Sequence, residues 1–495
     1  MPVTHHAATF GEKLRSLAAA DPGRPAITCG DETISRAEFV RRGDQLARAF
    51  AEQGIGPGDF VGIGLPTSAQ FLVAALATWN VGAIPQPLPA RITPGELSAI
   101  LGIVRPAGLV GLPAPAGGPV ELPAEASGRS DEPLPPVVAP TWKALMSGGS
   151  TGLPKTIVTH TPALADRVTA IAPLLRMPED SVAVFPAPMH HNAPFMFSVI
   201  ALLRGNHVIL QPRFDSARVL EAVDEHKAEW LYLVPTMMHR IWRLGPEARD
   251  AFSLDSLRTV VHMAAPCPQW LKRNWLEWLG ADRVLEVFSV TEGLAASSIT
   301  GGEWLAHPGS VGKVVSGQIK IVGPDGQECP PGQPGCLLLR GSADDDPGYH
   351  YLGAQPTVID GWQSLGDLGY FDEDGYLYLN DRDSDMIIVG GANVYPAEIE
   401  AALERHPDVQ AACVFGIPHT DLGAVPHAVV QSAAAIGFAD MDAFLRQHLL
   451  SYKLPRGLTV TLDPIRDDVG KMRRSALRAD WLRRNRPEGG GGAQR

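Results

Sequence analysis

The chain has little of what disulfide-bonded, zinc-binding or membrane-spanning proteins need. Its five cysteines are scattered over 495 residues without Cys-x-x-Cys spacing, so neither a disulfide framework nor a structural zinc site is expected. No apolar run approaches the ~18 residues that a membrane-spanning helix needs. The first six residues lack the basic and apolar segments of a secretory signal. We therefore expect a reduced, cytoplasmic protein without membrane insertion.

The chain also has fewer basic than acidic residues. The 42 Lys and Arg residues are outnumbered by 54 Asp and Glu residues, which gives a formal net charge of −12. A nucleic-acid partner is not expected, because no basic excess can neutralise its phosphates. Hydrophobic residues make up 45% of the chain, enough for sizeable cores, and the length suggests about two to four folding units.

Residues 26–88 and 163–288 alternate between helix-like and strand-like patterns. Residues 60–65 and 284–288 are short apolar runs typical of buried strands, whereas residues 163–175 have helical spacing. Ser35 and Glu38 are spaced as a capping box, which predicts the start of a helix. The β-α-β-α order predicts a parallel sheet flanked by helices.

After residue 309 the pattern changes to β-rich runs separated by turn signals such as Gly-Pro-Asp-Gly at 323–326. These runs predict a small antiparallel, barrel-like subdomain. A further αβ pattern from residue 382 is long enough for a C-terminal domain. We expect an α/β protein with a large N-terminal domain (1–383) of parallel-rich αβ sheets plus the β-barrel-like subdomain. A small mobile α+β domain (384–486) and a disordered, glycine-rich tail (487–495) complete the prediction.

Residues 146–155 read Met-Ser-Gly-Gly-Ser-Thr-Gly-Leu-Pro-Lys. Glycines let backbone amides approach an anion, hydroxyls donate hydrogen bonds, and the lysine adds positive charge, so this composition suits a polyphosphate-binding loop. An ordinary Gly/Ser surface loop is the alternative. A P-loop is disfavoured, because Pro154 occupies the place where that motif needs glycine. The candidate phosphate contacts are Ser147, Gly148, Gly149, Ser150, Thr151, Gly152 and Lys155.

Two other stretches carry groups suited to a nucleotide. Residues 288–292 read Phe-Ser-Val-Thr-Glu just after a predicted strand. There an aromatic ring can stack on a purine, while hydroxyl and carboxylate can hold phosphate and Mg²⁺. Asp367 lies in a tight Leu-Gly-Asp-Leu-Gly turn, where a carboxylate can bind two ribose hydroxyls. A polar strand end and an ordinary turn aspartate are the alternatives.

Three more features are ambiguous when taken alone. Residues 386–398 read as a strand, a Gly-Gly turn and a helix that begins at Pro396. Lys471 follows a glycine near the end of the chain and could be a solvated charge. His190 and His191 lack a third ligand at metal-binding spacing, so packing is a plainer reading than metal binding.

In this order the motifs resemble those of the AMP-forming adenylating enzymes, which comprise acyl-CoA synthetases, peptide-synthetase adenylation domains and firefly-type luciferases. The resemblance covers nearly the whole chain. His-His-Asn-Ala-Pro-Phe at 190–195 and Met-Ala-Ala-Pro-Cys-Pro at 263–268 look most like acyl-CoA ligases for bulky acids such as bile acids. Two departures are Ala264, where the family usually has glycine, and Ser384 at the hinge, where aspartate or lysine is commoner.

The resemblance implies a role for each candidate residue. The loop at 146–155 would bind the β- and γ-phosphates, and Mg²⁺ would be held by Glu292 with Thr151. Thr291 would contact the α-phosphate. Asp367 would bind the ribose, and Arg382 would contact the ribose or a phosphate. Lys471 would contact both the acid and the phosphates during adenylation. Adenine would be bound by Ala265, Phe288 and Ser289, and the thiol tunnel would be lined by His191 and Gly391.

The expected activity is that of an AMP-forming acyl-CoA ligase, an acid–thiol ligase using ATP, Mg²⁺ and CoA. A carboxylic acid, expected to be bulky and apolar or polycyclic, would become an acyl-adenylate and then a thioester. The C-terminal domain would rotate about Ser384 between the two steps. An acyl carrier protein in place of CoA, retention of one half-reaction only, and a homodimer stay open. An amino-acid-activating domain, a luciferase-type oxygenase and an ADP-forming P-loop kinase are less favoured.

Overall fold

The computed structural model describes residues 7–148, 154–341, 348–382, 385–389, 392–467, 472 and 474–485. Candidate residues Gly149, Ser150, Thr151, Gly152, Gly391 and Lys471, the hinge residue Ser384 and the predicted tail lie outside this part of the chain. The chain divides into two compact units: residues 1–263, 270–319 and 339–363 form the first, and residues 264–269, 320–338 and 364–495 the second. The predicted domain limits at 383/384 and 486/487 stay predictions.

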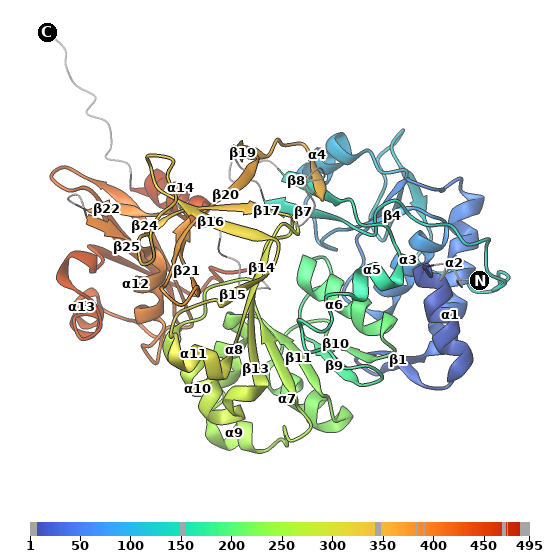
Figure 1. The fold of residues 1–495 in the computed structure, drawn as a ribbon, viewed down its shortest axis with the longest axis horizontal. Helices are drawn as coiled ribbons and strands as arrows, with labels where there is room; N and C mark the ends of the chain where they lie inside the picture. The colour runs from blue at the N-terminus through green and yellow to red at the C-terminus, as the bar shows by residue number, and fades with distance from the viewer. Residues whose placement is uncertain are drawn as a thin grey trace, which may run out of the picture. The chain divides into compact units, whose positions relative to one another are not determined.

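The largest sheet has nine strands in the order β15-β14-β13-β12-β11-β9-β10-β1-β2 (Figure 1). Its strands from β13 to β1 pair in parallel, and antiparallel strands lie at both edges. Strands β11 and β12 are buried at every residue, which is characteristic of the middle of a parallel sheet. The strands are β1 Pro25–Cys29, β2 Glu32–Ser35, β9 Val182–Phe185, β10 His207–Leu210, β11 Trp230–Leu233, β12 Thr259–His262, β13 Val284–Ser289, β14 Ala296–Thr300 and β15 Lys313–Ser316.

Two smaller sheets belong to the same unit. The first has the order β4-β3-β5-β6 and is parallel throughout. The second, β18-β8-β7, is antiparallel and carries the strands on either side of residues 149–153. Their bounds are β3 Phe60–Ile63, β4 Ile84–Pro87, β5 Gly108–Val110, β6 Val120–Leu122, β7 Ala144–Gly148, β8 Pro154–Thr159 and β18 Tyr349–Leu352.

Two of the helix predictions before residue 310 are wrong in part. Ser35 caps α2 by accepting a hydrogen bond from the Glu38 amide, as predicted, but the Glu38 carboxylate binds Arg41 and Arg42. The helix predicted at 163–175 is only Ala165–Thr169, because Pro173 cannot donate the hydrogen bond that would continue it. The helices are α1 Phe10–Ala20, α2 Arg36–Glu52, α3 Ala69–Asn80, α4 Pro94–Val104, α5 Ala165–Thr169, α6 Asn192–Leu203, α7 Ser216–His226, α8 Pro235–Trp242, α9 Pro246–Asp250, α10 Gln269–Leu279, the 3₁₀ turn η1 Ala281–Arg283 and α11 Gly301–Ala306.

The predicted β-rich region forms a five-stranded sheet. Its order is β16-β17-β20-β19, and β21 pairs with β20. Strands β20 and β21 are antiparallel, with Asp367 and Arg382 as cross-strand partners. The bounds are β16 Gln318–Val322, β17 Gly335–Arg340, β19 Thr357–Ile359, β20 Trp362–Phe371 and β21 Leu377–Arg382.

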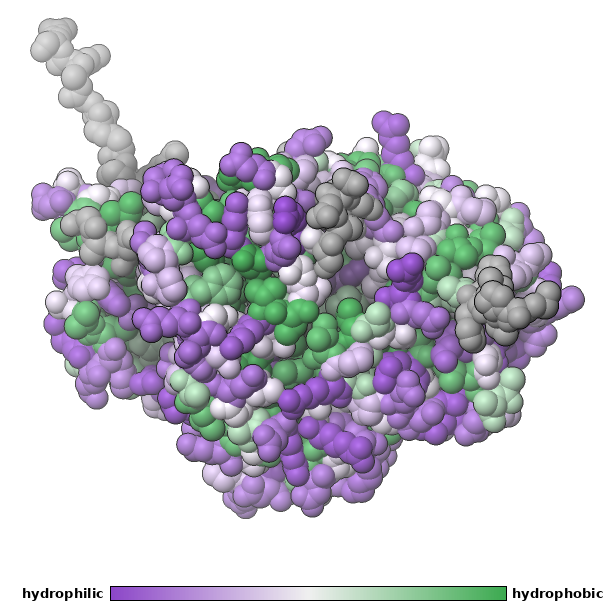
Figure 2. All heavy atoms as spheres, in the orientation of Figure 1, coloured by the Kyte–Doolittle hydropathy of each residue, from purple (hydrophilic) through white to green (hydrophobic). Residues whose placement is uncertain are grey.

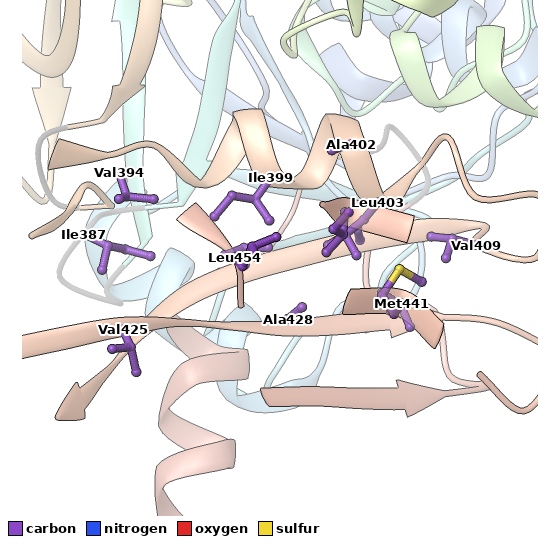
Figure 3. Close-up of a cluster of buried hydrophobic side chains, with 14 of the residues drawn as sticks. Ile387, Val394, Ile399, Ala402, Leu403, Val409, Val425, Ala428, Met441 and Leu454 are labelled. Carbon is purple, nitrogen blue, oxygen red and sulfur yellow. The ribbon is translucent and has the colours of Figure 1, made fainter. Parts of the chain in front are cut away.

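The C-terminal part is α+β, as predicted. Its sheet has the order β23-β22-β25-β24, with β26 paired with β25. Ile399 and Leu403 of α12 are buried against the strands, together with Val425 and Ala428 of β25 (Figure 3). The elements are β22 Ile387–Val389, β23 Ala392–Val394, α12 Pro396–Leu403, β24 Ala411–His419, β25 Gly423–Gln431, α13 Phe438–Leu445, the 3₁₀ turn η2 Ser451–Lys453, β26 Gly457–Thr461 and α14 Arg474–Arg484.

The α/β class with a parallel-rich large sheet is therefore confirmed. Hydrophilic residues are spread over the face of the molecule drawn in Figure 2. No helix in the described ranges is long and apolar enough to cross a membrane.

Candidate active site

Glu292, Lys155 and Tyr351 meet in the first unit. Glu292 follows β13, Lys155 lies in β8, and Tyr351 lies in β18, the antiparallel neighbour of β8. The Tyr351 hydroxyl donates a hydrogen bond of 2.6 Å to Glu292 Oε1. Lys155 Nζ lies 3.7 Å from the same oxygen and 3.9 Å from the centre of the Tyr351 ring. We call these three residues the Glu292 cluster.

The cluster compensates for the burial of a carboxylate. The Glu292 side chain is only 7% exposed, and an isolated charge in such a place is strongly unfavourable. Lys155 supplies the opposite charge, and its position over the aromatic ring adds about 0.5–2 kcal/mol. Burial, together with the hydrogen bond to Glu292, raises the pKa of Tyr351, so its hydroxyl remains a donor at neutral pH.

Strand β8, which carries Lys155, also borders the glycine-rich segment, together with β7. Ser147 pairs with Lys155, and Gly148 pairs with Pro154, between β7 and β8. For Ser147 and Gly148 the structure describes only the backbone. Lys155 thus lies at one end of the predicted phosphate loop, beside a buried carboxylate.

A second lysine, Lys143, is buried just before β7. Its Nζ donates a hydrogen bond to Asn192 Oδ1 and lies 3.7 Å from the sulfur of Met196, both in the first turns of α6. The side chain is 4% exposed. Burial lowers the pKa of Lys143 to about 7, although the negative charge of Glu292 opposes this change. Lys143 therefore connects the strand before the phosphate loop to the start of α6.

His191 stands at the N-cap position of α6. Its ring centre lies 4.1 Å from that of His190, and its carbonyl accepts a hydrogen bond from the Phe195 amide. Phe195 stacks on Trp142, with ring centres 6.2 Å apart. His191 is therefore fixed at the beginning of a well-packed helix, four residues before Phe195 of the aromatic core.

The predicted adenine segment lies at the end of β13. Phe288 is half-buried and pairs with Ser297 of β14, whereas Ser289 is exposed. Thr291 is half-buried and precedes Glu292 directly, so the carboxylate and this hydroxyl leave the sheet from the same strand end.

Glu286, two residues before Phe288 in β13, forms a buried ion pair. Lys272 of α10 donates a hydrogen bond to Glu286 Oε2, and His262 Nε2 lies 3.9 Å from the same oxygen. Burial lowers the pKa of His262, which keeps this ring neutral. The ion pair connects α10 to β13 two residues before Phe288.

In the second unit, the predicted ribose contacts Asp367 and Arg382 face each other across β20 and β21. Asp367 is half-buried, and only the backbone of Arg382 is described. Ala265 lies in the segment 264–269 of this unit. Its neighbour Ala264 has φ 76°, in the left-handed region that favours glycine. This backbone geometry gives a physical reason for the glycine usually found there in the resembled family.

The structure thus brings together Lys155 with Glu292 and Asp367 with Arg382. Tyr351 and Lys143 were not predicted from the sequence. Tyr351 could have been noticed from Tyr349-His350-Tyr351, where alternate residues of a strand share one face. Lys143 gave a weaker signal, namely a single charge that interrupts an otherwise uncharged approach to β7.

Comparison with known proteins gives consistent matches along the chain. The model described as AMP-binding enzyme matches residues 14–343, and that described as AMP-binding enzyme C-terminal domain matches residues 398–465. The feruloyl-CoA synthase of Amycolatopsis sp is 32% identical over 465 residues, which cover 90% of this chain and 93% of that protein.

Two further similarities extend over nearly the full length. The 3-[(3aS,4S,7aS)-7a-methyl-1,5-dioxo-octahydro-1H-inden-4-yl]propanoyl:CoA ligase of Rhodococcus jostii is 26% identical, covering 97% of this chain and 100% of that protein. The crystal structure of ATP-bound MatB from Rhodopseudomonas palustris has a TM-score of 0.79 and 26% identity, covering 96% of this chain and 99% of that one.

Proposed function

The chain belongs to the AMP-binding enzyme family, and we propose that it is an AMP-forming acyl-CoA ligase for a bulky apolar or polycyclic acid. The observation that carries the proposal is the Glu292 cluster, a buried carboxylate and a lysine at the end of a glycine-rich loop. An acid–thiol ligase agrees with the activities named for the two similar CoA ligases.

A magnesium ion fits the donors at Glu292. Among the described residues, no group of three or more His, Cys, Asp or Glu side chains could hold a metal alone. Mg²⁺ commonly uses one or two carboxylates together with the phosphates of a substrate, and Glu292 beside Thr291 supplies such a partial set. A bound Mg²⁺ would neutralise phosphate charge there. Thr151, the other predicted metal ligand, lies outside the described residues.

We assign the first half-reaction to residues around this cluster. The phosphates of ATP would bind the loop at 146–155, and Lys155 would compensate part of their charge. The acid's carboxylate would attack the α-phosphorus, forming acyl-AMP and releasing pyrophosphate. Lys471 would bridge the acid and the phosphates. Asp367 and Arg382 would bind the ribose, and Ala265, Phe288 and Ser289 would bind adenine.

In the second half-reaction the CoA thiolate would attack the acyl carbon and release AMP. His191 and Gly391 would line the path of the thiol, and rotation of the C-terminal domain about Ser384 would replace Lys471 with the loop of Gly391. A bulky substrate is supported by the polycyclic acid named for the Rhodococcus jostii relative. An acyl carrier protein as acceptor is the second candidate.

Substituting Lys471 tests the division of labour. Lys471→Ala should abolish ATP–pyrophosphate exchange, because two anions then meet without the bridging cation. The same variant should still convert supplied acyl-AMP and CoA into thioester. Loss of both reactions would contradict separate roles for Lys471 and the Gly391 loop.

A panel of carboxylic acids identifies the substrate and the acceptor. For each acid, AMP release is measured with CoA and with carrier protein. A strict preference for acetate would contradict a bulky pocket.

A further inference from the structure

Tyr351 has no assigned role in nucleotide binding, yet its hydroxyl holds the carboxylate to which we assign magnesium. We propose that Tyr351 is a positioning residue, which orients Glu292 for the Mg²⁺ ion that accompanies ATP. This inference rests on the proposed function, in which Glu292 is a metal ligand.

The position of Tyr351 is set by the fold. In β18 it pairs with Ile157 of β8, two residues from Lys155. The ring of Tyr349 packs against it in an edge-to-face arrangement, with ring centres 5.0 Å apart. Tyr351 also lines an open groove with Ile103 and residues 352–355. The phenol is therefore held by strand pairing and by Tyr349 at the side of a surface depression.

The hydroxyl acts on one oxygen of the carboxylate. A glutamate side chain ends in a torsion with a broad energy minimum, so without a fixed partner its two oxygens exchange places easily. The 2.6 Å hydrogen bond from Tyr351 fixes Oε1, and Oε2 is then the oxygen that can be offered to a metal. Outer hydrogen bonds of this kind orient metal ligands, and their loss typically weakens metal binding about 10–100-fold.

Lys155 makes the hydroxyl more important. Its ammonium already lies 3.7 Å from Oε1 and rests on the Tyr351 ring. When the hydroxyl is removed but the ring is kept, Lys155 becomes the main described partner of Oε1. A closer Lys155–Glu292 pair would compete with the metal for the same negative charge.

The test measures metal–nucleotide binding directly, with Mn²⁺ as the probe. Free Mn²⁺ is followed by electron paramagnetic resonance during titration of the full-length protein with a non-hydrolysable ATP analogue. Tyr351→Phe should weaken Mn²⁺ binding about 10-fold or more. The matched control is Tyr378→Phe in β21. It also removes a phenol–carboxylate hydrogen bond, which Tyr378 donates to Asp372 over 3.2 Å. The control should bind Mn²⁺ like the wild type.

Glu292→Gln, alone and combined with Tyr351→Phe, distinguishes the positioning role of Tyr351 from the metal-binding role of Glu292. Tyr351 acts through Glu292, so its substitution should add no further loss once the carboxylate is gone; an additive loss would indicate a merely structural role. Unchanged or tighter Mn²⁺ binding in Tyr351→Phe, with weakened binding in Glu292→Gln, would overturn the inference and leave the proposed function intact. Unchanged binding in Glu292→Gln would overturn the assignment of the metal to Glu292.

Discussion

Replacing Lys143 with methionine should change how the protein's stability depends on pH. Lys143 is 4% exposed, and its ammonium contacts the Asn192 amide oxygen, the Met196 sulfur and the adjacent Trp142 ring. Burial lowers its pKa from 10.5 to about 7. At about 1.4 kcal/mol per pKa unit, holding the charged form inside the fold at low pH costs about 5 kcal/mol.

The sign follows from which state binds the proton. Below pH 7 Lys143 is protonated in both the folded and the unfolded chain, so the buried ammonium destabilises the fold by the full amount. Between about pH 7 and 10.5 only the unfolded chain holds it, so the free energy of unfolding of the wild type rises with pH. Lys143→Met lacks this term, because methionine does not titrate. The stability advantage of the variant over the wild type should therefore shrink by about 2 kcal/mol from pH 7 to pH 9.

Urea unfolding of both proteins at several pH values measures this difference. Loss of the hydrogen bond to Asn192 adds an offset that is independent of pH, so the slope carries the information. Lys227→Met is the control, because the Lys227 side chain is 70% exposed. This control corrects for the loss of a lysine from the surface at each pH. If the Lys143→Met difference changes with pH no more than the control does, burial does not lower the pKa of Lys143.

Two substitutions in the second unit test the backbone strain at Ala264 and the ion pairs of Arg474. Ala264→Gly should raise stability by about 1 kcal/mol, because the left-handed backbone costs alanine about 1–2 kcal/mol and the greater freedom of glycine in the unfolded chain cancels part of that gain. An unchanged melting temperature would contradict strain at φ 76°. Arg474→Ala should lower stability by about 3–5 kcal/mol, because Arg474 bridges Asp385 and the buried Glu400; proteolysis that is no faster than in the wild type would contradict this.

The sequence predicted most of the framework because hydrophobic periodicity and turn residues act locally. The parallel sheet around β11 and β12 follows from short runs that are apolar at every position. Where local rules competed, the prediction was wrong. The helix at α5 ends before Pro173, although the apolar spacing predicted that it would continue. The Glu38 carboxylate pairs with Arg41 and Arg42 instead of completing the predicted capping box with Ser35.

The candidate site could be predicted only in part. Lys155 and Glu292 were found because each stands in a short motif, and the fold brings them within 3.7 Å. Tyr351 and Lys143 stand in no motif, and their importance arises from contacts between residues 49 to 59 positions apart. Only the pairing of β18 with β8 and the packing of α6 bring such residues together. The roles of Lys471 and Gly391 stay predictions.

The identity of the nucleotide product distinguishes an AMP-forming ligase from an ADP-forming kinase. The purified protein is incubated with MgATP, CoA and an acid that the panel identifies, and the products are separated by chromatography. An AMP-forming acyl-CoA ligase should give equal amounts of AMP, pyrophosphate and acyl-CoA, with no thioester when the acid is omitted. Formation of ADP and phosphate in place of AMP and pyrophosphate would contradict it.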